Sequence, residues 1–317
     1  MARRSRSQGP KAGGIFLFLL GLFVGAGILY LFLKPSAPRG GETEPPAAAR
    51  SEAPRATRRA EHRKLPSDHV EPEAPAATTA PAATETVTPA GPIHGARVAL
   101  VIDDLGHDVA DLRPLEALGV PVTYSVLPYE PQTPEVVAEL RRRKAEMLLH
   151  LPMEPVHGQN PGPGALLQGM SDGELRQKTE EALKAVPGAV GVNNHMGSLL
   201  SAEEGPMNAV LSVLAERGLF FLDSRTSADS VGYKVALGLG VPAAERQVFL
   251  DGDESPEAIH AQFQRLLTLA RTRGAAIAIG HPHPETLAAL TREVPKAKEE
   301  GFEFVPVSFL LTRAGGE

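Results

Sequence analysis

From Arg97 to residue 312, short apolar runs alternate with longer amphipathic stretches, and no other feature of this 317-residue chain constrains its fold more. The apolar runs predict strands at 98–102, 122–127, 146–151, 189–194, 219–223, 247–250, 275–280 and 302–307. The stretches between them predict helices at 108–118, 133–144, 171–186, 206–217, 255–273 and 284–299. This alternation predicts a parallel sheet covered by helices. Seven or eight such units in roughly 220 residues fit a closed or nearly closed (β/α) barrel better than an open doubly wound sheet.

Polar side chains follow six of the expected strands, at the point where each strand ends. They are Asp103–Asp104, His150, Asn193–Asn194–His195, Asp223–Ser224–Arg225, Asp251–Gly252–Asp253 and His281–Pro282–His283. In a barrel the carboxyl ends of the strands converge on the face that carries the chemistry. One Asp after a strand is ordinary turn chemistry, but six strands that end this way predict an active-site mouth.

Adjacent carboxylates and two histidines suggest a metal site in this mouth. Because side chains alternate along a strand, one of Asp103 and Asp104 would face a metal and the other the substrate beside it. His150 and His195 add two imidazoles, and two His with one Asp leave a coordination position open for water, as in catalytic zinc sites. The chain has no cysteine, so any metal must be held by His and carboxylate side chains.

Two further strand-end residues have useful chemistry. His281 could give a proton to a leaving group, and Arg225 could orient a carboxylate base through a charge-assisted hydrogen bond. Neither Ser198 nor Ser224 lies in a G-x-S-x-G context, so a serine hydrolase is disfavoured.

Five segments together carry a resemblance to a known family. They are VIDDLG at 101–106, HLPMEP at 150–155, NNHMGS at 193–198, DSRT at 223–226 and GHPHP at 280–284. In this order, and over residues 97–312, they resemble the divergent polysaccharide deacetylases, a branch of the metal-dependent carbohydrate esterase superfamily. The resemblance implies an α/β fold with a distorted (β/α) barrel of seven or eight units, and a divalent metal, with zinc (Zn2+) preferred.

The resemblance also implies roles for the matching positions. The implied roles are Asp103 as catalytic base, Arg225 as partner of the base, His281 as general acid, and Asp104, His150 and His195 as metal ligands. The other side chains at these strand ends are expected to contact substrate, and they are Asn193, Asn194, Asp223, Glu154 and Asp251.

Two departures from the orthodox deacetylase motifs bear on the metal. Orthodox members have Gly directly after the Asp pair, where this chain has Leu105, and two His four residues apart, where the position four after His150 is Glu154. Either His195 replaces the missing ligand, or Glu154 coordinates, or the metal site is weakened. We rank them in that order because imidazole is the commoner ligand of catalytic zinc.

The expected function is removal of acetyl groups from an N-acetylated cell-envelope polysaccharide of the peptidoglycan type. The alternative is a catalytically inactive barrel that binds envelope glycan or a partner protein; it is motivated by the missing His and by the scarcity of aromatic residues, 5% with no Trp. The first strand ends in IDDLG, without the glycine spacing or Lys of a phosphate loop, so no nucleotide is expected. Of 38 acidic and 32 basic side chains, 30 and 20 lie from Arg97 onward, which argues against nucleic acid.

The N-terminal region predicts a membrane anchor. Residues 15–33 form an uncharged apolar run long enough to span a hydrocarbon core. Basic residues concentrate in the preceding tail, 1–14, so this tail is expected in the cytoplasm and the folded domain outside it, attached by a single pass to the inner or cytoplasmic membrane. A cleaved signal is the alternative, but no small-x-small cleavage site follows closely, which favours the anchor.

Residues 34–96 connect this span to the folded domain. They carry 11 of the 29 prolines and few large apolar residues, so they are expected to form a disordered, semi-extended linker. The basic run from Arg55 to Lys64 is interpreted either as simple solvation or as contact with anionic lipid or wall polymer.

Overall fold

A computed structural model describes residues 95–313 of the chain. The expected tail at 1–14, the anchor at 15–33 and all but the last two residues of the expected linker lie outside the described residues. Among the helices of the described part, none combines the length and the apolar character that crossing a bilayer requires.

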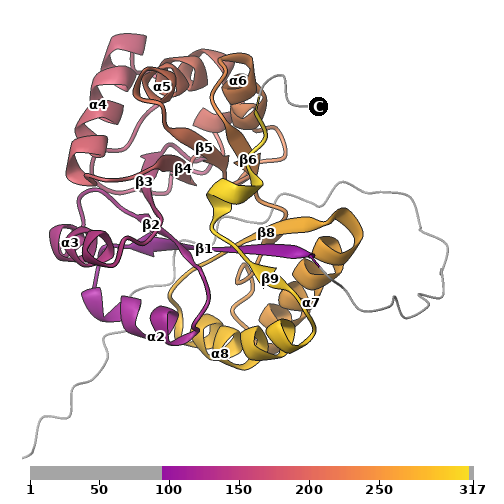
Figure 1. Cartoon of the computed structure of the whole chain (residues 1–317). Helices are drawn as coiled ribbons and strands as arrows, with labels where there is room; N and C mark the ends of the chain where they lie inside the picture. Colours follow the sequence, from indigo (N-terminus) through magenta and orange to yellow (C-terminus); the bar gives the residue numbers. More distant parts are fainter. Residues whose placement is uncertain (1–94, 314–317) are drawn as a thin grey trace, which may run out of the picture. The chain divides into compact units, whose positions relative to one another are not determined.

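In the described part, nine parallel strands form one sheet at the centre of the domain (Figure 1). The strands are β1 (Arg97–Leu105), β2 (Thr123–Val126), β3 (Met147–Met153), β4 (Gly191–Met196), β5 (Phe220–Asp223), β6 (Ala243–Glu245), β7 (Val248–Phe249), β8 (Ala275–Gly280) and β9 (Glu303–Phe304). Their order is β6-β5-β4-β3-β2-β1-β8-β7, and β9 pairs with the first residues of β1.

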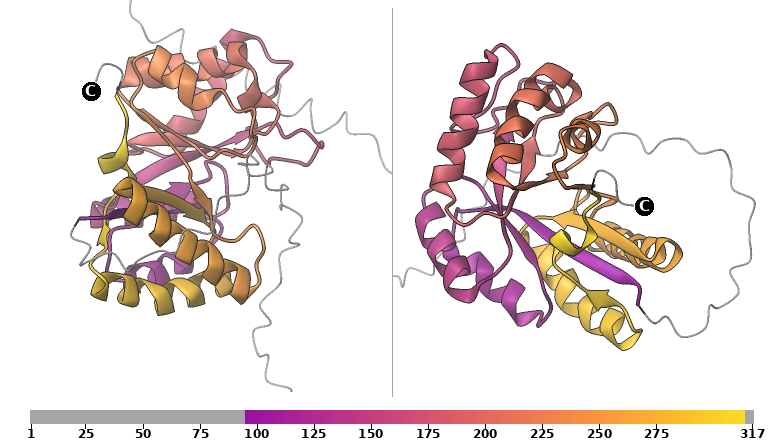
Figure 2. Two further views of the ribbon diagram at one scale, coloured as in Figure 1. Left: turned by 90° about the vertical axis from the view of Figure 1, so that its right-hand side faces the viewer. Right: turned by 45° about the horizontal axis from the view of Figure 1, so that its top comes forward.

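Helices cover the outer face of this sheet (Figure 2). They are α2 (Leu112–Ala117), α3 (Thr133–Arg143), α4 (Asp172–Ala185), α5 (Glu204–Arg217), α6 (Gly232–Gly238), α7 (Pro256–Arg273) and α8 (Pro284–Glu299). All eight expected strands and six expected helices are confirmed; the first expected helix contains a short 3₁₀ turn, Val109–Asp111, before α2. The sequence prediction missed α6 and β6, which have only 7 and 3 residues and carry weak periodic signals.

The sheet is a curled half-barrel, so of the expected closed or nearly closed barrel the parallel α/β arrangement is confirmed and full closure is not. Among residues 95–313 no strand pairing joins β6 to β7, the two ends of the sheet. Two residues of chain cross the gap instead. Arg246 N donates to Asp223 O at 3.0 Å on β5, and the next amide, Gln247 N, donates to Ile277 O at 3.1 Å on β8. The end strands β6 and β7 pair with β5 and β8 but not with each other, so the backbone of these two residues is what connects the two edges of the sheet.

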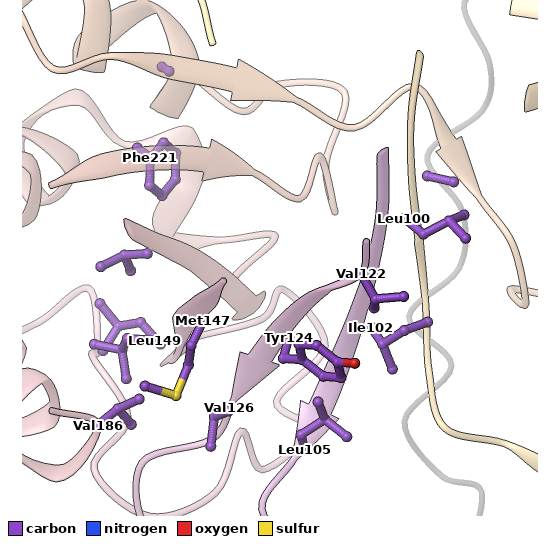
Figure 3. Close-up of a cluster of buried hydrophobic side chains, with 14 of the residues drawn as sticks. Leu100, Ile102, Leu105, Val122, Tyr124, Val126, Met147, Leu149, Val186 and Phe221 are labelled. Atoms are coloured by element: carbon purple, nitrogen blue, oxygen red, sulfur yellow. The ribbon is translucent and has the colours of Figure 1, made fainter. Parts of the chain in front are cut away.

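The core lies on both faces of the sheet. Leu100 and Ile102 of β1 point outward and pack in the large cluster beneath the helices (Figure 3). The alternate residues, Ala99 and Val101, point inward into a second cluster. Val307 is fully buried in this inner cluster, and its amide donates to Thr123 Oγ1 at the start of β2. The inside of the curl is therefore plugged with apolar side chains at the end where the strands begin.

Candidate active site

The same inward positions that build the inner core become polar at the other end of the strands. The pairs of inward neighbours are Val101–Asp103 on β1, Leu148–His150 on β3 and Ile279–His281 at the end of β8. Successive inward side chains, two residues apart on the same strand, thus change from apolar to titratable. The mouth expected from the sequence exists, and its floor is the apolar plug.

A bulge in β1 brings both carboxylates of the Asp pair into this mouth. The pairing of β1 with β2 shifts register between Ile102 and Leu105, and Asp104 adopts a left-handed backbone conformation with φ 57°. A regular strand would send the second Asp to the opposite face. Met196 and Arg225, at the ends of β4 and β5, have φ 50° and 52°. Non-glycine residues in this region cost free energy and cluster at functional sites.

Three of the expected ligands lie together. Asp104 Oδ1 is 2.9 Å from His195 Nδ1 and 3.2 Å from His150 Nε2, and the two ring nitrogens are 3.2 Å apart. Ligand atoms on one face of a tetrahedral zinc site lie about 3.3 Å apart when the metal–ligand bonds are about 2.0–2.1 Å. Asp104 Oδ1 is buried and, among the described residues, receives no well-aligned hydrogen bond. The three atoms therefore could hold a divalent cation, an arrangement that agrees with the first of the three alternatives, in which His195 takes the place of the missing ligand.

Asn193 fixes the orientation of both Asp103, the expected base, and His150, an expected ligand. Its Nδ2 donates to Asp103 Oδ1 and Oδ2 at 2.9 and 3.1 Å, so its Oδ1 faces the other way. That oxygen accepts from Ser125 Oγ and lies 2.9 Å from His150 Nδ1. Because an amide oxygen only accepts, Nδ1 of His150 must carry the proton. The lone pair of the neutral ring is then on Nε2, the nitrogen that faces Asp104.

Electrostatic interactions within the cluster favour an ionised Asp104 beside a protonated imidazole. Burial alone would raise the pKa of Asp104, but the nearby imidazoles of His195, His150 and His281 lower it well below its usual range. Burial likewise would lower the pKa of His150, yet the carboxylates of Asp103 and Asp104 raise it. A cation that binds here meets an ionised carboxylate and displaces a proton from imidazole.

His281 lies across the mouth and is held by Asp251. Its Nδ1 is 3.0 Å from Asp251 Oδ1, its backbone N donates to Asp251 Oδ2 at 2.6 Å, and its Nε2 is 3.9 Å from Asp104 Oδ2. Burial alone would lower the pKa of His281, but the carboxylates of Asp251, Asp104 and Asp103 raise it to about 10. His281 is therefore protonated at neutral pH, with Nε2 aimed into the mouth.

Asp251, His281 and His283 form a second cluster with ligand-type atoms close together. Both oxygens of Asp251 are already engaged, one by His281 Nδ1 and the other by His281 N and Thr286 Oγ1. This set supports a proton carrier better than a second cation. Asp251, expected to contact substrate, instead positions His281.

Arg225 does not reach Asp103, the expected base. Its guanidinium donates to the carbonyls of Ser230 and Ala228 at 3.1 and 3.2 Å and lies 3.9 Å from Glu245. The expected pairing of Arg225 with Asp103 is corrected, because the left-handed turn at Arg225 directs its side chain to the loop after β5. The neutral amide of Asn193, expected at the substrate, takes the place beside Asp103.

Three other expected substrate contacts are occupied by structural hydrogen bonds. Buried Asn194 ties the ends of β4 and β5, accepting from Ser224 N and donating to Met196 O. Asp223 accepts from Arg225 N, Ser230 Oγ and Tyr233 N, and so organises the start of α6. The carboxylate of Glu154 accepts from Gln168 N at 2.6 Å and closes the loop that joins them.

A hollow of about 430 Å³, counted out to open solvent, adjoins Asp104 and His195. Residues that the sequence analysis did not assign line it, among them Tyr129, Glu130 and His107. Tyr129 and Glu130 follow β2, as the assigned residues follow their own strands, so the strand-end rule would have found them. Leu127 and Pro128 separate these two residues from the apolar run of β2, which is why they were not assigned from the sequence.

Fold and site together define a class. This class is a curled parallel α/β half-barrel that carries, at the carboxyl ends of its strands, an Asp-His-His cluster, a second carboxylate and an Asp-held histidine. The chain belongs to the divergent polysaccharide deacetylase family, whose sequence profile matches residues 100–311.

Comparison with individual proteins supports the same relationship. The uncharacterized protein YibQ of Escherichia coli K12 is 36% identical over 203 residues, 64% of each chain, so the match spans slightly less than two thirds of that relative. An uncharacterized protein of Haemophilus influenzae Rd is 36% identical over 194 residues, which cover 61% of this chain and 69% of that one. The crystal structure of the uncharacterized protein ATU2773 from Agrobacterium tumefaciens C58 is 30% identical, with a TM-score of 0.64, and covers 70% of this chain and 92% of its own.

Proposed function

We propose that this protein is a metal-dependent hydrolase that removes acetyl groups from an N-acetylated polysaccharide of the cell envelope, of the peptidoglycan type. The observation that carries the proposal is the division of the mouth into three parts: the Asp104, His150 and His195 cluster, the carboxylate of Asp103 beside it, and protonated His281 opposite. Membership of a deacetylase family supports the choice of an acetyl amide as the bond that is cleaved.

Asp104, His150 and His195 would hold the divalent cation, for which zinc is the best candidate. When bound, such a cation polarises an acyl oxygen and lowers the pKa of water. Asp103 is 3% exposed and its carboxylate is fixed by two hydrogen bonds from Asn193, so it can accept the proton of an attacking water without reorienting. His281 can donate the proton of Nε2 to the departing amine, while Asp251 stabilises the ring on its Nδ1 side.

Two substitutions test this division. Asp104→Asn should abolish metal binding, because an amide oxygen is a poor ligand for a divalent ion beside two imidazoles. Asp103→Asn should retain the metal and lose roughly 10² to 10⁴ in turnover, the usual contribution of a general base. Elemental analysis of the purified chain and acetate release from N-acetylglucosamine oligomers measure the two effects. A metal-loaded chain that released no acetate from any acetylated glycan would overturn the proposal, and loss of metal in Asp103→Asn alone would exchange the two roles.

A second candidate is a catalytically inactive barrel that binds envelope glycan or a partner protein. The observation that favours it is the neutral partner of Asp103, since the resemblance implied a guanidinium at that place. The two candidates differ in their need for metal. A purified chain that binds glycan with no bound metal, and with affinity unchanged by Asp104→Asn, would select this second function.

The sequence of residues 1–96 supports a further proposal on location. We propose that residues 15–33 anchor the chain in the inner or cytoplasmic membrane, with the described domain outside the cytoplasm. The chain should then stay in the membrane fraction through high-salt and carbonate washing. Release of a soluble species that begins near Ser36 would identify a cleaved signal instead.

A further inference from the structure

The hollow beside Asp104 and His195 has two walls that the proposed chemistry does not use. One wall is the segment Leu127–Glu130 that follows β2, with His107 beside it. The other is formed by residues 160–163 in the loop after β3. We call this hollow the Tyr129 pocket. Because it opens at two of the three candidate metal ligands, whatever occupies it lies next to the reacting bond.

Tyr129 gives this pocket a fixed aromatic surface. The residue is 40% exposed, and its ring packs against Gly164 in the loop. A Cβ at position 164 would lie 2.2 Å from Cε2 of the ring, and Gly164 has φ +79°, so the loop can take this course only with glycine. The ring therefore needs little ordering when a ligand binds, which reduces the entropy lost on binding.

Glu130 gives the pocket a fixed carboxylate. Its carboxylate is 2.9 Å from His107 Nδ1, with 18% of the side chain exposed. Its backbone N donates to Thr133 Oγ1, and its Cβ lies where a side chain on Gly106 would touch it, at 3.1 Å. An ionised carboxylate accepts hydrogen bonds from hydroxyl or ammonium groups and repels other anions.

No Lys or Arg is among the lining residues in the described part of the chain, and Glu130 is the lining carboxylate that lies outside the Asp104, His150 and His195 cluster. We infer that the Tyr129 pocket is a pyranose subsite that accepts a neutral or amino sugar, stacked on Tyr129 with its hydroxyls on Glu130, and excludes a sugar that carries a carboxylate. A concave site with apolar and aromatic walls and a few fixed polar groups is typical of small-ligand pockets. The position of the sugar relative to the scissile amide rests on the function proposed above.

Three small probes separate charge from size at this subsite. They are the methyl glycosides of N-acetylglucosamine, of N-acetylmuramic acid, and of N-acetylmuramic acid methyl ester, which keeps the lactyl group without its charge. Binding to the zinc-loaded full-length chain is measured by NMR titration, with Asp103→Asn present to prevent turnover. The acid should bind at least about tenfold more weakly than both neutral probes, since like charges at close range cost several kcal/mol.

Variants assign this selectivity to the pocket. Glu130→Gln should strengthen binding of the acid severalfold, whereas Glu257→Gln, the same change of charge on an exposed residue of α7, should leave the ratio unchanged. Tyr129→Ala should weaken the neutral probes about tenfold and Tyr129→Phe should not, because stacking uses the ring. Retained zinc content reports that each variant keeps its site.

Equal binding of acid and ester would overturn the exclusion by charge, and so would a ratio that Glu130→Gln leaves unchanged. Full affinity in Tyr129→Ala would overturn the stacking surface. If no acetate is ever released but this binding pattern holds, the pocket assignment stands and only the proposed reaction is lost. If acetate is released from a glycan but probe binding is unchanged by Tyr129→Ala and Glu130→Gln, the proposed reaction stands and this inference is lost.

Discussion

At the scale of single residues, Asn193 links several parts of the candidate site through one side chain. Its two side-chain polar atoms contact Asp103, which is the proposed base, one metal-ligand candidate and Ser125, and the residue is fully buried. Removing it would leave the carboxylate of Asp103 and the ring N–H of His150 without these partners in a buried place. Asn193 is therefore a positioning residue, although sequence reasoning placed it at the substrate.

We expect Asn193→Ala to lower zinc affinity by about 10- to 100-fold, the usual effect of removing a group that orients a ligand. Turnover should fall as well, because Asp103 loses its fixed orientation. Competition with a chelator measures the first effect and acetate release the second. Arg225→Ala is the control, since its guanidinium contacts loop carbonyls. Larger loss of turnover in Arg225→Ala than in Asn193→Ala, with zinc retained by both, would return Arg225 to the role implied by resemblance.

The charge on His281 predicts how stability depends on pH in the metal-free protein. Its pKa is raised to about 10 in the folded state, against about 6.5 in an unfolded chain. A raised pKa stabilises the fold fully below about pH 6.5, and this contribution is lost as the pH rises toward 10. With chelator present, the melting temperature of the protein should exceed that of His281→Gln by more at pH 6 than at pH 10. For the control variant His157→Gln, a change at an exposed loop histidine, the difference in melting temperature should not be larger at pH 6 than at pH 10.

At the scale of elements, left-handed residues mark where strands end and the site begins. Asp104, Met196 and Arg225 adopt positive φ at the mouth, whereas Lys144 does so at the end of α3, remote from it. The turn at Asp104 brings its carboxylate to the imidazoles of His150 and His195, so its backbone cost serves the proposed metal site. The turn at Lys144 only ends a helix, where glycine is the preferred residue.

Lys144→Gly should therefore stabilise the protein, by up to about 1 kcal/mol, because glycine enters the left-handed region without the Cβ penalty. Metal affinity and acetate release should not change. Chemical unfolding of both proteins measures the free-energy difference. Lys184→Gly is the matched control, because Lys184 lies in the last turn of α4, within the helix, where glycine costs about 1 kcal/mol. Destabilisation by both substitutions would show that the Lys144 side chain contributes more than its backbone strain costs.

Elements and site differ in how far the sequence could predict them. Long periodic segments such as 256–273 were predictable because burial repeats along the whole element. The mouth positions of Asp103 and His150 were predictable because the inward register of β1 and β3 runs from the core into the mouth, whereas Asp104 reaches the mouth only through the bulge in β1. The partner of Asp103 was not, since the φ of Arg225 and the choice between Asn193 and Asn194 depend on contacts between strands.

At the scale of the whole domain, the two-residue connection Arg246–Gln247, which we call the crossing, links the two edges of the curled sheet. Consecutive amides of Arg246 and Gln247 bond to opposite ends of the sheet. The side chain of Gln247 does the same, since its Oε1 accepts from Ile277 N at 2.7 Å and its Nε2 donates to Glu245 O. The three ligand candidates lie on β1, β3 and β4, away from this crossing, so closure and metal binding should be separable.

Gln247→Ala should destabilise the domain by about 1–3 kcal/mol, because it leaves Ile277 N–H and Glu245 C=O without their side-chain partner at a partly buried junction. In a domain of this size, that corresponds to a melting temperature lowered by about 2–4 °C per kcal/mol. Zinc affinity should stay unchanged, because neighbouring ladders of β1 to β4 hold the ligands. The matched control is Gln177→Ala on the exposed face of α4, which breaks one helix-surface hydrogen bond to Glu181 and should cost at most about 0.5 kcal/mol. Equal shifts for the two variants would mean that the crossing adds no stability beyond an ordinary surface contact, and that pairing within the sheet alone holds the half-barrel in its curl.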